Sequence, residues 1–148
     1  MDDFLTRLEA VEHRVSALEQ QLPTPAVLSD DGMVTFSGSA TAAGGNWEYE
    51  WARPAAHLID TAWESSLNRV AALAHPQRFA IMRTLIDAPT TVPELVARGI
   101  TTSQGSCYHH VNALVAAGWV EKTTTGQFRI PGTRVIPLLC IIAAGELP

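Results

Sequence analysis

Residues 91–130, TVPELVARGITTSQGSCYHHVNALVAAGWVEKTTTGQFRI, decide the fold of this chain. Thr91 and Glu94 have the spacing of a capping box, in which each side chain binds the backbone N–H of the other residue at the start of a helix. After a short connector, Ser103 is a suitable N-cap for a second helix, and Gly118 is a suitable residue to end it. Two helices joined by so short a connector predict a helix-turn-helix unit.

The neighbouring segments predict that this unit is winged. Trp119–Lys122 and Gln127–Ile130 have the pattern of two short strands joined by a glycine turn. An amphipathic helix precedes the unit, and an apolar helix over Val135–Ala144 follows it, which tolerates Pro137 only in its first turn. We therefore expect a mainly α fold with small β, in which a winged helix-turn-helix domain with a C-terminal dimer helix spans residues 55–148.

Residues 1–22 have a heptad pattern of apolar residues that ends at a proline. Arginines at g positions and glutamates at e positions would pair between parallel helices, which predicts a coiled-coil dimerisation arm and a homodimer. The alternative is an amphipathic helix folded against its own body. The expected dimer contacts are Phe4, Leu8, Val11, Val15, Leu18 and Leu22 of the arm and Leu138, Ile141 and Ile142 of the last helix.

Residues 30–53 have the pattern of an aromatic β-hairpin, with Trp47, Tyr49 and Trp51 on one face of its second strand. Two interpretations remain open for this face. It either packs against the arm or the domain, as most aromatic strand faces do, or it forms a pocket for a small apolar effector together with Trp63 and the last helix.

Three motifs carry a family resemblance, and they lie between about residue 70 and residue 145. They are Leu73-Ala74-His75-Pro76-x-Arg78-Phe79-x-Ile81-Met82-x-x-Leu85, Thr91-Val92-x-Glu94-Leu95 and Ser103-Gln104-x-x-x-x-His109-His110-Val111-x-x-Leu114-x-x-Ala117-Gly118-Trp119-Val120. The chain resembles ArsR-type bacterial regulators in these motifs. The resemblance implies a dimeric transcription regulator, usually a repressor, that binds double-stranded operator DNA.

The helix that Ser103 begins would be the recognition helix. A buried stripe of Cys107, Val111, Leu114 and Val115 would leave short polar residues facing outward, small enough for a major groove about 12 Å wide. The neighbouring His110 is expected to pack on the core side. The expected DNA contacts are Ser103, Gln104, Gly105, Ser106, Tyr108 and His109 of this helix, together with Lys122, Arg129 and Arg134 of the wing region.

Charge is unevenly distributed along the chain. The net charge is −5, but residues 1–74 carry four arginines against eleven acids, a net −7, whereas residues 75–148 carry a net +2. So small a basic excess predicts a modest, salt-sensitive affinity for DNA. It also keeps open an alternative function, a winged-helix module for protein–protein interaction with little affinity for DNA.

Composition and motifs argue against several other classes of protein. Cys107 and Cys140 are too few for a disulfide framework and suit a reducing cytoplasm, and the ten apolar residues from Val135 are about half of a membrane span. The cysteine pair of the metal-sensing ArsR-type proteins is absent. The sequence also has no glycine-rich phosphate loop, no nucleophile elbow, and no His-x-Glu or Cys-x-x-Cys pair. We therefore expect a cytoplasmic, non-enzymatic protein with no metal and no cofactor.

Overall fold

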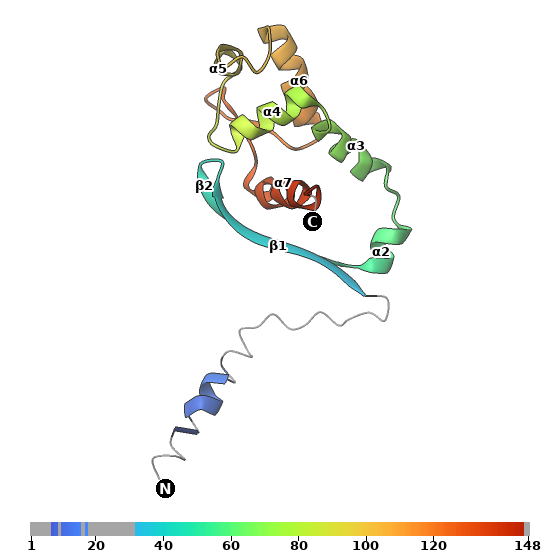
Figure 1. Cartoon of the computed structure of the whole chain (residues 1–148), viewed down its shortest axis with the longest axis vertical. Helices are drawn as coiled ribbons and strands as arrows, with labels where there is room; N and C mark the ends of the chain where they lie inside the picture. The colour runs from blue at the N-terminus through green and yellow to red at the C-terminus, as the bar shows by residue number, and fades with distance from the viewer. Residues whose placement is uncertain (1–6, 9, 16, 18–31, 147–148) are drawn as a thin grey trace.

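The computed structural model describes residues 7–8, 10–15, 17 and 32–146. Beyond the helical arm residues, the described part has this element order: β1 (Met33–Ala42), β2 (Gly45–Pro54), α2 (Ala55–Asp60), α3 (Glu64–Leu73), α4 (Pro76–Leu85), α5 (Val92–Ala97), α6 (Gln104–Ala116), β3 (Glu121–Lys122), β4 (Phe128–Arg129) and α7 (Gly132–Ala144). The strands form two separate antiparallel hairpins, β1–β2 and β3–β4. The expected mainly α fold with small β is confirmed (Figure 1).

The described arm residues, 7–8, 10–15 and 17, are helical, as their heptad pattern predicts. Leu8, Val11 and Val15 are each about half exposed, so the described part of the apolar stripe is not covered by the same chain. This exposure disfavours an arm folded against its own body. Phe4, Leu18 and Leu22 lie outside the described residues, and pairing between two arms stays a prediction.

The β1–β2 hairpin is longer and tighter than its sequence predicts. Its strands pair from Met33 with Pro54 to Ala42 with Gly45, which leaves only two residues in the turn. Those residues, Ala43 and Gly44, both have positive φ, +51° and +77°, as a type I′ turn requires. The buried Ala43 donates its N–H to the carbonyl of Ile86 at 2.5 Å, which ties the turn to the end of α4.

One face of this hairpin packs on α7, along which the hairpin curves in Figure 1. Gly38 lies so close to Ile136 that a Cβ on it would approach that side chain to 3.3 Å. The indole of Trp47 lies directly against Gly132 at the start of α7, and its Nε1–H donates to the carbonyl of Ala42 at 2.7 Å. The packing interpretation of the aromatic face is therefore correct for Trp47.

The core lies where α4, α5, α6, α7 and the β3–β4 hairpin meet. Its fully or almost fully buried side chains include Ile81, Leu85, Leu95, Val111, Leu114, Trp119, Phe128, Ile130 and Val135. The indole N–H of Trp119 donates to the carbonyl of Arg69 at 2.7 Å and so joins α3 to the start of the β3–β4 hairpin. Within the described residues, no helix has the length and apolar character that crossing a membrane requires.

Helix α7 corrects two predictions. It begins at Gly132, three residues before the predicted start, so Pro137 lies in its second turn rather than its first. Pro137 has no N–H to donate to the carbonyl of Thr133, four residues before it. Thr133 is exposed, so water can bind this carbonyl instead. Leu138 was expected in a dimer interface, but it is buried in the chain's own core, whereas Ile141 and Ile142 are exposed.

Candidate nucleic-acid interface

The N-terminal half of α6 presents polar side chains to solvent from a well-capped helix start. The Ser103 hydroxyl accepts the Ser106 N–H at 3.2 Å and acts as the N-cap that the sequence predicts. Gln104, Gly105 and His109 are exposed, and a Cβ on Gly105 would meet nothing within 4 Å. The first turn of α6 is therefore open to an approaching partner, with unpaired backbone N–H groups and the positive end of the helix dipole beside it.

The opposite side of α6 is buried, although its stripe differs from the predicted one. Cys107, His110, Val111 and Leu114 are buried, but Val115 is 38% exposed. Val115 lies seven residues after the exposed Tyr108, two turns along the same edge of the helix, so the core side ends before it. Burial raises the pKa of the Cys107 thiol, which suits a packing role for this cysteine.

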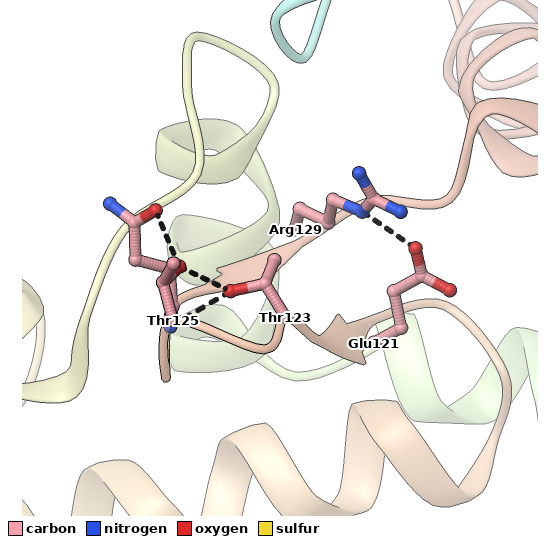
Figure 2. Close-up of polar contacts among 5 residues, drawn as sticks. Glu121, Thr123, Thr125 and Arg129 are labelled. Carbon is pink, nitrogen blue, oxygen red and sulfur yellow. Dashed lines mark hydrogen bonds and ion pairs between the residues drawn. The ribbon is translucent and has the colours of Figure 1, made fainter.

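The β3–β4 hairpin follows α6 in the chain, and β4 has the expected alternation of sides. Phe128 and Ile130 are buried, and Arg129 between them is exposed beside its cross-strand partner Glu121. Lys122 is also exposed, but it is the cross-strand partner of Phe128 and lies on that side, with Nζ 5.9 Å from the centre of the Phe128 ring. Figure 2 shows the ion pair between Arg129 Nε and Glu121 Oε1 at 2.6 Å. Sequence reasoning missed Glu121, although two opposite charges directly across a predicted hairpin are a signal that could have found it.

The tip of this hairpin is held by its own side chains (Figure 2). The hydroxyls of Thr123 and Thr125 lie 2.9 Å apart, and the Thr123 hydroxyl also accepts the Gln127 N–H at 3.1 Å. Gly126 has a φ of +83°, which closes the turn in a conformation that glycine adopts without strain. The tip is thus a defined turn whose side-chain hydroxyls are already bonded to one another.

From α5 to β4, the described geometry is a pair of helices joined by a tight turn and followed by a two-stranded wing. Residues 73–123, about a third of the chain, match a protein-family model described as a helix-turn-helix domain. Together with β4, which follows it, this segment forms a winged helix-turn-helix domain. The match confirms the helix-turn-helix part of the resemblance to ArsR-type regulators.

Comparison with solved structures and curated proteins adds two findings. A solution NMR structure of the homodimeric winged helix-turn-helix DNA-binding domain of a possible ArsR-family transcriptional regulator from Mycobacterium bovis is similar to this chain. The similarity has 25% sequence identity, covers 63% of this chain and 87% of that one, and has a TM-score of 0.45. No curated protein matches the sequence.

Three histidine rings lie close together, that of His75 at the N-cap of α4 and those of His109 and His110 in α6. The ring of His110 is 4.6 Å from the ring of His75 and 5.4 Å from that of His109. Burial lowers the pKa of His110, and the neighbouring charges of His75, His109 and Arg78 lower it further. His110 is 7% exposed, so it packs on the core side as expected. Its buried Nδ1 has no hydrogen-bond partner among the described residues.

Two further cations of the domain are held by defined partners. The guanidinium of Arg134 lies 5.6 Å from the ring centre of Trp119, and Arg134 belongs to the first turn of α7 rather than to the wing. Arg78, within the first family motif, donates from Nε to the carbonyl of Ala72 and from Nη2 to that of Ala71 at 3.3 Å. Arg78 therefore satisfies carbonyls at the C-terminal end of α3, a role that the sequence does not reveal.

The predicted effector pocket is not assembled. Trp63 is 65% exposed and donates its indole N–H to the carbonyl of Leu58 at 2.8 Å, while Phe36 stacks on Tyr49 and Trp51 within the hairpin at ring distances of 5.7 and 5.1 Å. A different pocket of about 340 Å³ lies between α4 and α7. Its lining residues are Phe79, Met82, Arg83, Ile86, Asp87, Leu138, Leu139 and Ile142.

Within the described part of the chain, no group of three His, Cys, Asp or Glu side chains is arranged to hold a metal ion.

Proposed function

We propose that the chain is a transcription regulator that binds double-stranded DNA in the bacterial cytoplasm, with α6 as its recognition helix. The observation that carries this proposal is the exposed polar first half of α6 on a helix-turn-helix domain. A recognition helix of this kind enters the major groove with its N-terminal residues facing the bases. The resemblance to ArsR-type proteins adds repression as the expected mode of control.

The proposed contacts divide into those that read bases and those that position the protein. The Gln104 amide has the donor and acceptor pair that recognises adenine, and Tyr108 and His109 lie on the same exposed side. Lys122 and Arg129 of the wing are exposed cations suited to phosphate oxygens, which carry no sequence information directly. Supporting contacts with the DNA backbone are assigned to Ser103, Ser106 and Arg134.

A homodimer is the second part of the proposal, and the apolar surface supports it. Trp63, Leu67 and Val70 form an exposed apolar stripe on and just before α3, and Ile141 and Ile142 add exposed apolar side chains on α7. A soluble monomer seldom exposes so many large apolar residues together. A symmetric pair would place two recognition helices about one turn of DNA apart, as a palindromic operator requires.

Selection of bound fragments from genomic DNA at two salt concentrations tests the proposal. We expect enriched fragments that share a short motif and an affinity that falls steeply with salt, by roughly one logarithmic unit per phosphate neutralised for each tenfold rise in salt. Gln104→Ala should relax the base preference, whereas Arg129→Ala should weaken binding to all sequences alike. Arg53→Ala is the matched control, because it removes a positive charge from the β1–β2 hairpin. It should leave both the base preference and the strength of DNA binding unchanged.

The second candidate function is a winged-helix module for protein–protein interaction, which the net −7 of residues 1–74 favours. It predicts no enriched fragment at either salt concentration. It also predicts equal, weak binding by the wild type and by Gln104→Ala. Either result would remove the DNA-binding proposal.

A further inference from the structure

Glu121 and Arg129 form an ion pair on the exposed side of the wing. They are direct partners across the two strands, and the Nε–Oε1 distance is 2.6 Å (Figure 2). We propose that Glu121 is a positioning residue for DNA binding, which orients the Arg129 guanidinium toward a phosphate of the DNA backbone. This inference rests on the proposed function.

The geometry of the pair leaves the end of the guanidinium free for a second anion. An arginine has five N–H donors, and Glu121 takes only the one on Nε. Among the described residues, the two terminal nitrogens of Arg129 have no hydrogen-bond or ion-pair partner. The four remaining N–H groups form the fork that binds two oxygens of a phosphate at once.

Stabilisation of the fold does not explain why a carboxylate lies here. The two side chains are 54% and 44% exposed, and an ion pair of that exposure contributes little to folding because water screens it. A carboxylate beside a phosphate backbone also repels it. Glu121 therefore has a place in a DNA-binding wing only if its effect on Arg129 outweighs that repulsion.

The backbone of the wing, from which Arg129 projects, is held in place by hydrogen bonds at the hairpin tip. The hydroxyls of Thr123 and Thr125 and the N–H of Gln127 bond to one another at the tip, so the direction of the two strands is set. The remaining freedom lies in the long, flexible side chain of Arg129, and ordering such a side chain opposes binding. Glu121 would order it before DNA arrives.

Two substitutions of Glu121 separate orientation from charge. Glu121→Gln keeps a side-chain oxygen that can accept the Nε–H of Arg129 but removes the negative charge, whereas Glu121→Ala removes both. We expect Glu121→Gln to bind operator fragments at least as tightly as the wild type. Glu121→Ala should bind about 2- to 10-fold more weakly than Glu121→Gln, since Arg129 must then be ordered on binding.

A double-mutant cycle assigns the effect to Arg129. In an Arg129→Ala background, the Gln and Ala variants of Glu121 should bind equally, and the salt dependence should be lower by about one phosphate contact. The inference is overturned if both Glu121 variants tighten binding equally, or if their difference persists without Arg129. If instead the wild type and Gln104→Ala both fail to select fragments, the proposed function itself has failed. Equal thermal unfolding midpoints for all five variants, the three single and the two double ones, would exclude a folding defect.

Discussion

Replacing Gly132 with alanine should destabilise the protein, although the same change in most helices is stabilising. Gly132 is the first residue of α7, and alanine is favoured over glycine in helices by about 1 kcal/mol. However, a Cβ at this position would lie 1.9 Å from Cζ3 and 2.4 Å from Cε3 of Trp47. The two groups cannot share this space, so the indole must move.

The size of the effect follows from what the indole loses when it moves. Trp47 packs against the core and donates its Nε1–H to the carbonyl of Ala42 at 2.7 Å. Overpacking costs about 1–3 kcal/mol, and the lost hydrogen bond adds about 1 kcal/mol. After the helix gain of alanine is subtracted, we expect a net loss of about 2 kcal/mol, which lowers the melting temperature by roughly 4–8 °C for a chain of this length.

Thermal and urea unfolding, followed by circular dichroism, measure this loss against a matched control. Gly105→Ala changes another glycine in the first turn of a helix, but the added Cβ meets nothing within 4 Å. It should therefore stabilise the fold by up to about 1 kcal/mol. In a Trp47→Leu background, Gly132→Ala should lose most of its penalty. A Gly132→Ala protein as stable as the wild type would refute the placement of the indole, and with it the docking of the β1–β2 hairpin on α7.

Three further predictions concern the histidine cluster, a helix cap and the apolar surface. The pKa of His110 is lowered in the folded protein, so the unfolded chain binds the proton first as the pH falls. The contribution of His110 to stability should therefore be full above about pH 6.5 and decrease below it. Urea unfolding at pH 7.5 and 5.5 should show that the free energy of unfolding changes less between the two pH values in His110→Phe than in the wild type. Thr91→Ala removes the capping box of α5 and should cost about 1 kcal/mol of unfolding free energy. The backbone N–H and the hydroxyl of Thr91 both donate to Glu94 and lower its pKa, and the substitution removes only the hydroxyl, the smaller of the two causes. The pKa of Glu94 should therefore rise in part, and an NMR titration that finds it unchanged would contradict the contribution of the hydroxyl. Leu67→Glu should shift a dimer toward monomer in analytical ultracentrifugation, whereas Asn68→Glu on the same helix should not, and equal behaviour of the two would place the dimer contacts elsewhere.

Local signals in the sequence were enough to predict the helices of the winged domain. The capping box at Thr91 and Glu94 and the N-cap at Ser103 form as expected, because each depends on residues three positions apart on one chain segment. The alternation that buries Phe128 and Ile130 is equally local. For the same reason the exposed side of α6, and with it most of the candidate interface, was predictable.

Other features depend on partners that are distant along the chain, and no local pattern encodes them. Val115 has the spacing of a buried residue, yet α6 passes the limit of the core before it reaches that position. Helix α7 packs against the β1–β2 hairpin, although the two segments are some ninety residues apart in the chain. This packing places Trp47 against Gly132, and Leu138 of the same helix is buried in the core. Side-chain periodicity reports which residues share a face, since it arises from the backbone repeat of a single element. What covers that face depends on how separate elements pack, which is a property of the whole folded chain.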